Sequence, residues 1–237
     1  RAINRKILRI LFTSGVALAV IGALGLALFL YPQPLFAWSV QSDNLSLYSD
    51  LPFSPEAGRT VLEQVKRKLA TSPLYSTQEH YAIFICNTVW RRTLFFIGDQ
   101  HAGGLVYYPL STNVFLSGAN MEDNRLISRS GLPDVLGRKL DHFMAHEIAH
   151  DLTGQAVGWP RYQALPVWIR EGYAEYIGSQ GVFDYGASLE AFRTEAPVMN
   201  LPASIPYRRY TLLVAYLLEK QRWTEQQLFA TTLTQAD

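Results

Sequence analysis

The chain has 237 residues, of which 49% are hydrophobic, 13% aromatic and 17% charged. This composition excludes a disordered, collagenous or coiled-coil protein, and the length accommodates one ordinary domain with an appendage. The formal net charge of +1 argues against a nucleic-acid partner, and the single cysteine excludes a disulfide framework. That cysteine, Cys86, lies in an apolar segment, so we expect an inert core thiol and no disulfide-linked partner.

The N-terminal segment has the length and composition of a transmembrane helix. Residues 10–30 carry no charge, and as a helix they rise about 31 Å, which matches the hydrocarbon thickness of a bilayer. The positive-inside rule places the N-terminus in the cytoplasm and the remainder of the chain outside, because no basic residue follows the apolar run until Arg59. We therefore expect residues 1–31 to form a cytoplasmic stub and a single membrane span. The basic residues that precede the run are Arg1, Arg5, Lys6 and Arg9.

A cleaved signal peptide is the alternative interpretation of this segment. The apolar region of a signal peptide is normally shorter, about 7–15 residues, and ends at small residues. The nearest candidate site, at residues 35–37, has the bulky Leu35 where a small residue is needed. The sequence therefore favours an uncleaved anchor, with the aromatic rings of Tyr31, Phe36 and Trp38 at the far membrane interface.

The segment after the anchor predicts a linker and then a helix. Residues 32–52 contain two prolines and a polar stretch, and we expect them to form a juxtamembrane linker. A helix-start signal, Ser54-Pro55-Glu56, is followed by an apolar face, which predicts a helix over about 55–70.

The remainder predicts an α+β domain over residues 53–237, because strand-like runs precede helical ones. Short aromatic or β-branched runs, separated by Asn, Gly and Pro, predict strands at 81–86, 93–97, 104–108 and 113–116. Apolar periodicity predicts helices over about 133–153, 166–179, 207–221 and 224–234.

The first of these helices contains the motif His146-Glu147-Ile-Ala-His150. Residues four apart lie on one face of a helix, so two imidazoles at this spacing can bind one metal ion. Glu147 lies beside the first histidine, where a carboxylate can accept a proton from a metal-bound water. Two ordinary histidines on a helix are the simple alternative, and the pattern alone is a hypothesis.

A third ligand would have to be a carboxylate. His142 is excluded, because eight residues of helix separate it from His150 by about 12 Å. No histidine follows His150, and the residues after it lack the glycine and histidine of the metzincin pattern. Further along the chain, Glu171 and Glu175 are four residues apart and would share a helix face. Spacing alone leaves open which of them binds the ion, and a solvated helix face remains the alternative.

The combined pattern resembles that of the gluzincin metallopeptidases, within the broad peptidase MA-like group of HExxH zincins. The resemblance implies a zincin-like domain, in which a small mixed β-sheet precedes a helical half, and one bound Zn²⁺ ion. It also implies that Glu171 is the third ligand and that Glu175 orients the first histidine. Two histidines and one glutamate leave a fourth position for water, as in catalytic zinc sites. The matching residues are His146-Glu-x-x-His150 and Trp168-x-x-Glu171-Gly-x-Ala-Glu175.

A tyrosine is the expected donor to the oxyanion that forms during peptide hydrolysis. Gluzincins often supply this donor from a later helix, and Tyr207 and Tyr210 are the candidates here. The resemblance favours Tyr210, while ordinary aromatic packing explains both tyrosines equally well. The strand at 113–116 is the expected edge with which an extended substrate pairs, and a polar turn is expected at 118–124.

These features predict a membrane-anchored zinc peptidase that acts on a peptide or protein substrate outside the cytoplasm. In this hypothesis Glu147 is first a general base and then a general acid. The alternative is a catalytically silent zincin-fold module that binds or assembles partners at the membrane. The presence of Glu147 favours the peptidase, because a binding role needs no carboxylate at this position.

Overall fold

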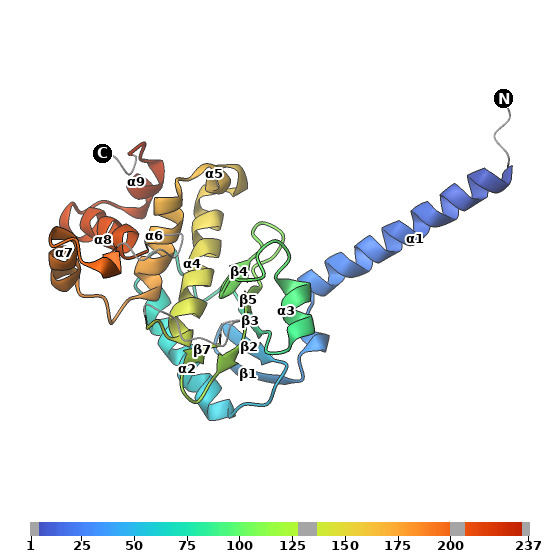
Figure 1. Cartoon of the computed structure of the whole chain (residues 1–237), viewed down its shortest axis with the longest axis horizontal. Helices are drawn as coiled ribbons and strands as arrows, with labels where there is room; N and C mark the ends of the chain where they lie inside the picture. Colours follow the sequence, from blue (N-terminus) through green and yellow to red (C-terminus); the bar gives the residue numbers. More distant parts are fainter. Residues whose placement is uncertain (1–4, 128–136, 200–206, 234–237) are drawn as a thin grey trace.

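The computed structural model describes residues 5–127, 137–199 and 207–233. It has an α+β architecture in which helix α1 (Arg5–Leu30) projects from a folded domain (Figure 1). Helix α1 includes a stretch, Arg9–Leu30, that is long and apolar enough to cross a membrane, and none of that stretch is buried. The expected α+β class is therefore confirmed. The start of the predicted helix at 133–136 lies outside the described residues.

A mixed five-stranded sheet forms one side of the domain. The strands are β1 (Trp38–Ser42), β2 (Leu45–Ser49), β3 (Tyr81–Ile85), β4 (Gly104–Val106) and β5 (Val114–Leu116). Their order is β1-β2-β3-β5-β4, with β2, β3 and β5 parallel and with β1 and β4 antiparallel to their neighbours. A separate hairpin pairs β6 (Ala119–Asn120) with β7 (Arg125–Leu126), which agrees with the expected turn at 118–124.

The linker predicted at 32–52 is wrong, because its residues 38–42 and 45–49 form β1 and β2. Its serine and asparagine content resembles that of a loop, but Leu45 and Leu47 alternate with polar residues and are fully buried. Phe36 was expected at a membrane interface, but it is buried against Phe84 in the domain. The chain therefore passes from α1 into the sheet through a few residues, which include the 3₁₀ turn Gln33–Leu35.

The strand predicted at 93–97 is also wrong, because residues Val89–Phe95 form helix α3. The carboxylate of Asp50 accepts hydrogen bonds from the backbone N–H groups of Asn87 and Thr88, at 2.9 and 2.8 Å. These bonds hold the chain at the point where the helix begins. This long-range contact is not visible in the local apolar pattern, which fits a strand or a helix.

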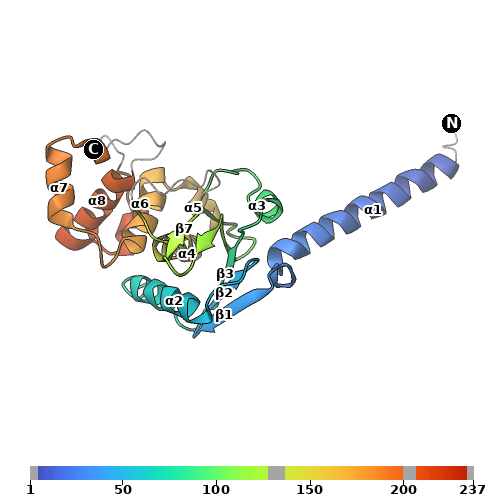
Figure 2. The same ribbon diagram turned by 60° about the horizontal axis from the view of Figure 1, so that its bottom comes forward.

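The remaining helices cover one face of the sheet and build the rest of the domain. Helix α2 (Pro55–Leu69) begins at Ser54, as predicted, and packs its apolar face toward the sheet and α4. Figure 2 shows α6, α7 and α8 at the end of the domain opposite to α1. The C-terminal elements are α4 (Leu140–Val157), α5 (Trp159–Ala164), α6 (Val167–Gly178), α7 (Tyr185–Arg193), the 3₁₀ turn Pro197–Met199, α8 (Tyr207–Ala215) with a π-helical turn Tyr216–Lys220, and α9 (Glu225–Ala230).

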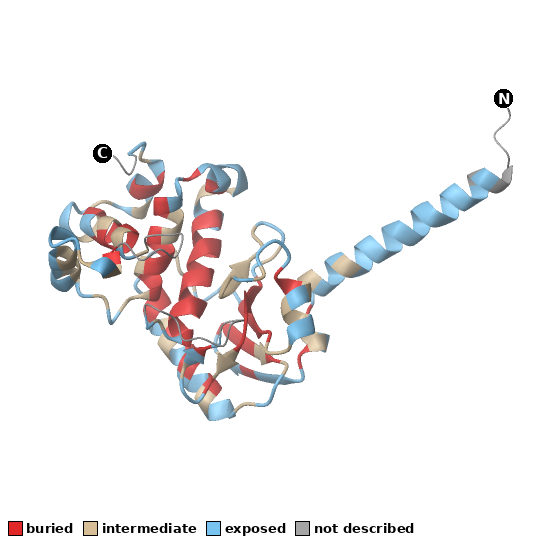
Figure 3. Ribbon diagram, in the orientation of Figure 1, coloured by how far each residue is buried: buried red, intermediate tan, exposed pale blue. Residues whose placement is uncertain are grey.

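The core lies on both faces of the sheet. Alternate residues of β3 point in opposite directions, so Ile83 and Ile85 pack toward α2 and α4, while Ala82 and Phe84 pack toward α3. Cys86 is fully buried in the same cluster as Ala82 and Phe84, on the side of the sheet that packs against α3. Helix α4 is buried on all sides from Leu140 to Gly154, and Figure 3 shows this buried band beside that of α6. The ionisable side chains of α4 are consequently held in the interior.

Candidate metal centre

Helices α4 and α6 bring two imidazoles and one carboxylate to a common point. His146 and His150 lie one turn apart on α4, and their Nε2 atoms are 3.1 Å from each other. From α6, Oε2 of Glu171 lies 3.5 Å from Nε2 of His146 and 3.6 Å from Nε2 of His150. In a tetrahedral zinc site with bonds near 2.0–2.1 Å, neighbouring ligand atoms lie about 3.3–3.4 Å apart. The three residues therefore fit a zinc ion in both chemistry and spacing.

Glu175 hydrogen-bonds to the first histidine of this group through the ring nitrogen that does not face Glu171 and His150. Its Oε2 atom accepts a hydrogen bond from Nδ1 of His146 at 3.1 Å, since a carboxylate can only accept. A proton is thereby placed on Nδ1, and Nε2, the atom available to a metal ion, faces Glu171 and His150. This is the contact expected of a residue that orients a metal-binding histidine.

Glu175 has two further partners that were not predicted from the sequence. Nε2 of His142 donates to the same carboxylate oxygen at 3.0 Å, and Nη1 of Arg138 donates to it at 3.3 Å. His142, His146 and Glu175 also form a group with ligand atoms within 4.8 Å of one another. These atoms already hydrogen-bond around Glu175, whereas Nε2 of His146, Nε2 of His150 and Oε2 of Glu171 face one point. The second group is therefore the better candidate for a metal site.

Glu147 points from α4 toward the edge of the sheet. A Cβ atom on Gly104 of β4 would lie only 2.6 Å from Oε1 of Glu147, so the strand and the carboxylate are in close contact. The edge strand is β4, and β5, predicted to be the edge at 113–116, lies between β3 and β4. The prediction of the edge was wrong because the weak strand signal at 104–108 did not reveal its pairing partner. The edge of the sheet and Glu147 are thus adjacent.

The electrostatics of the cluster favour a bound cation. Burial alone would lower the pKa of His146, but hydrogen bonds with Glu171 and Glu175 outweigh burial and raise it to about 10. Burial alone would raise the pKa of Glu171, but His150 and His146 lower it well below its ordinary range. Burial raises the pKa of Glu147, which makes that carboxylate more basic. The carboxylates therefore stabilise positive charge where the two Nε2 atoms meet.

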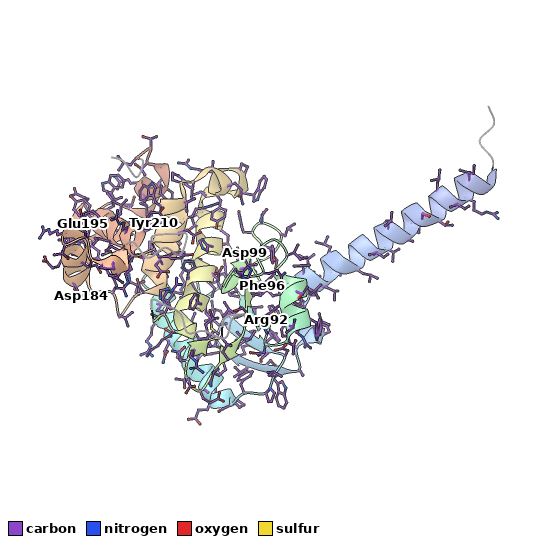
Figure 4. The ribbon with its side chains drawn as sticks, in the orientation of Figure 1. Arg92, Phe96, Asp99, Asp184, Glu195 and Tyr210 are labelled. Carbon is purple, nitrogen blue, oxygen red and sulfur yellow. The ribbon has the colours of Figure 1, made fainter. Side chains whose placement is uncertain are left out.

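Tyr207, one of the two candidate tyrosines, contacts the candidate metal cluster. Its ring centroid lies 6.1 Å from that of His146, in an edge-on arrangement. Arg138 places its guanidinium 4.9 Å from the centre of the same ring. Tyr210, which the resemblance favoured, is buried in the core of the helical half, on α8 (Figure 4).

The packing of α6 against α8 requires a small residue at position 172, directly after Glu171. A Cβ atom on Gly172 would lie 3.0 Å from the carbonyl oxygen of Tyr210 and 2.9 Å from Cγ2 of Val214. Helices α6 and α8 are therefore in close contact beside the candidate third ligand. The small residue lets α8 pack against the helix that carries Glu171.

A cavity of about 330 Å³ lies on the other side of Glu175 from the metal position. His142, Glu175 and Lys68 line it, together with residues of α7 and α8, whereas the three candidate ligands do not. Lys68 is buried there and donates to the carbonyl oxygens of Gly178 and Gln180 at 2.8 and 2.9 Å. The cavity is therefore separate from the cluster in which the chemistry would occur.

No family model matches the chain, and a search among curated proteins found no match. The resemblance to the gluzincins consequently rests on the two motifs and on the arrangement of the side chains that carry them.

Proposed function

We propose that the protein is a membrane-anchored zinc peptidase of the gluzincin type, with a zincin-like catalytic domain. One observation carries the proposal. Nε2 of His146, Nε2 of His150 and Oε2 of Glu171 lie 3.1–3.6 Å apart, as the ligands of one tetrahedral ion do. Three protein ligands leave one position for water, which is typical of catalytic zinc sites and not of structural ones.

The side chains around this point have complementary roles in peptide hydrolysis. Bound zinc would lower the pKa of its water and polarise the scissile carbonyl. Glu147 accepts the proton of that water and donates it to the leaving amine. Glu175 keeps the proton of His146 on Nδ1, so that Nε2 is available as a ligand. The hydroxyl of Tyr207 is the donor to the oxyanion, a role that we assign to it because of its contact with His146.

We expect the substrate to bind along the edge strand. Among the described residues, β4 ends the sheet, and its Gly104 lies against the carboxylate of Glu147. An extended peptide that pairs with the backbone of β4 would therefore pass beside Glu147. This arrangement supports a peptide or protein segment in extended conformation as the substrate.

The membrane location is part of the same proposal. Helix α1 contains a 22-residue stretch with mean hydropathy 2.2, which is sufficient to span a bilayer. Basic residues before it and none soon after it favour a cytoplasmic N-terminus and an extracytoplasmic domain.

The test uses the full chain in lipid nanodiscs, with its zinc content and its cleavage of a diverse peptide library measured together. We expect about one zinc ion per chain and cleavage that a zinc chelator abolishes. Glu147→Gln should retain zinc and lose cleavage by about 100-fold or more. Glu190→Gln, which changes an exposed carboxylate on α7, is the matched control and should cleave normally.

Two results would reject the proposal. Cleavage that persists undiminished in Glu147→Gln would exclude the role of this carboxylate. Stoichiometric zinc without hydrolysis of any peptide would exclude the peptidase and favour the silent binding module instead.

A further inference from the structure

We propose that the domain lies on the bilayer through an apolar surface around helix α3, which we call the α3 surface. It consists of Tyr31, Val89, Trp90, Ile97 and Leu110. The partner is the interface of phospholipid headgroups and acyl chains. This inference rests on the proposal that α1 spans the membrane, and it is independent of the peptidase chemistry.

The end of α1 is joined rigidly to the domain. The ring of Phe29, in its last turn, lies edge-on to Phe95, Tyr107 and Phe115, with centroid distances of 5.5, 5.3 and 6.3 Å. The side-chain amide of Asn113 donates to the carbonyl oxygens of Phe29 and Leu30 at 2.8 and 3.2 Å. The last turn of the helix is thus packed and capped by the domain, so the domain cannot swing freely about it.

Helix α3 is held beside this junction. Nε of Arg91 donates to the carbonyl oxygen of Leu35 at 2.8 Å, and the guanidinium also pairs with Asp50. Figures 1 and 2 both show α3 beside the C-terminal end of α1, at the end of the domain from which α1 projects. Arg92, Phe96 and the following Asp99 lie at the same end (Figure 4). The membrane boundary after Leu30 therefore passes close to α3.

The exposed side of α3 and the residues that follow it carry apolar side chains. Phe95 and Phe96 are buried against the sheet, whereas Val89, Trp90 and Ile97 are 64%, 50% and 61% exposed. Val89 and Trp90 lie in α3 and Ile97 lies two residues after its end, and a group of exposed apolar side chains indicates an interaction surface. Aromatic residues at the end of a span are typical of the membrane interface, and the guanidinium of Arg91 lies 4.2 Å from the centre of the Trp90 ring.

The position of the α3 surface, beside the end of the proposed membrane span, indicates that lipid covers it. The apolar residues are continuous with the end of a membrane span and are fixed to it by Phe29, Asn113 and Arg91. A helix with an apolar side at this depth is buried in the boundary between headgroups and acyl chains. The bilayer therefore covers the α3 surface without any movement of the domain.

The experiment places a fluorescent label on single introduced cysteines of the full chain in nanodiscs. The native Cys86 is fully buried, and an unsubstituted chain measures its background labelling. Ile97→Cys reports on the α3 surface, and Leu18→Cys reports on α1. Val182→Cys is the matched control, because Val182 is also exposed, at 77%, but lies just after α6 at the far end of the domain. Val89→Cys is a second reporter on α3 should Ile97→Cys fold poorly.

Lipids that carry a nitroxide near the headgroup should quench the label at position 97 about twofold or more, and leave the label at 182 unchanged. Lipids that carry it near the chain end should quench the label at position 18. Iodide in the water should quench the label at 182 much more than the label at 97.

Three outcomes would overturn the inference. Equal quenching of positions 97 and 182 by iodide would show that water covers the α3 surface. Protection of position 97 from both iodide and nitroxide lipids would show that a protein, including a second copy, covers it. Failure to quench position 18 would reject the membrane span itself, and with it this surface, whereas zinc binding and peptide cleavage would be unaffected.

Discussion

Gly104 of the edge strand lies directly against the carboxylate of Glu147. A Cβ atom at position 104 would come within 2.6 Å of Oε1 and 2.7 Å of Cγ of that glutamate. Contacts this short require one of the two residues to move. The position of the proposed general base therefore depends on a glycine 43 residues earlier in the chain.

Gly104→Ala is expected to displace Glu147 and to lower kcat for peptide cleavage by at least about tenfold. Zinc content should stay the same, because no ligand is changed. Gly103→Ala is the matched control, since its new methyl group would meet the flexible end of Leu126 and the ring of Phe143 and not Glu147. Equal activity of the two variants would show that the contact has no role in the reaction.

The two glutamates of α6 are expected to differ in their effect on zinc affinity. Glu175→Gln should weaken zinc binding by about 10- to 100-fold, because Glu175 only orients His146. Glu171→Gln should weaken it further, because it replaces a charged ligand with a neutral amide. Competition with a chromogenic chelator measures both affinities. A larger effect of Glu175→Gln would exchange the roles assigned to the two residues.

Tyr207→Phe is expected to lower kcat by about 100-fold and to leave KM nearly unchanged, because a donor to the oxyanion acts only in the transition state. Tyr210→Phe, which changes the neighbouring tyrosine of the same helix, should alter kcat by no more than about a few-fold. Steady-state kinetics on one cleaved peptide separate the two effects. A large loss in Tyr210→Phe alone would restore the role that the family resemblance suggested.

Asp50→Asn is expected to destabilise the domain by about 1–3 kcal/mol, because its buried carboxylate accepts several hydrogen bonds at the start of α3. Burial alone would raise the pKa of Asp50, but hydrogen bonds from Thr88 and Asn87 outweigh burial and hold it below its ordinary value of 3.8. The unfolded chain therefore takes up this proton at a higher pH than the folded chain.

The stabilisation by Asp50 is accordingly complete above the pKa of the unfolded state and is lost as the pH falls through the lower pKa of the folded state. The difference in melting temperature between the original chain and Asp50→Asn should be constant near neutrality and shrink below about pH 3.8. Both melts are measured in detergent with a chelator present, so that loss of zinc does not contribute. A difference that grows with acidity would contradict the assigned shift.

The parts of the fold that the sequence predicted are those governed by local patterns. The helix after Ser54 and the buried helix that contains His146 follow from capping and periodicity. The strands at 38–49 were missed because their serines look like a loop, and their strand conformation is stabilised by pairing with Tyr81–Ile85. The error at α3 has a similar cause, because Asp50 lies 37 residues before the Asn87 that it holds.

The candidate site shows the same division. His146, Glu147 and His150 could be identified from one helical turn, and Glu171 from a second motif. The contact of Gly104 with Glu147 and the hydrogen bond of His142 to Glu175 were not predicted, because the packing of β4 and α6 against α4 creates them and no local spacing reports it. Tyr207 and Tyr210 were both candidates, and the preference for Tyr210 depended on the resemblance and stays a prediction, although the ring of Tyr207 lies beside that of His146.

Phe29 is part of helix α1, and its ring packs against the folded domain. A protease that severs the chain after Leu30 would remove this ring and leave the faces of Phe95, Tyr107 and Phe115 open to water. A domain released in this way would expose an apolar aromatic patch, and we expect it to aggregate. Cleavage at this point is therefore not expected to yield a stable soluble domain.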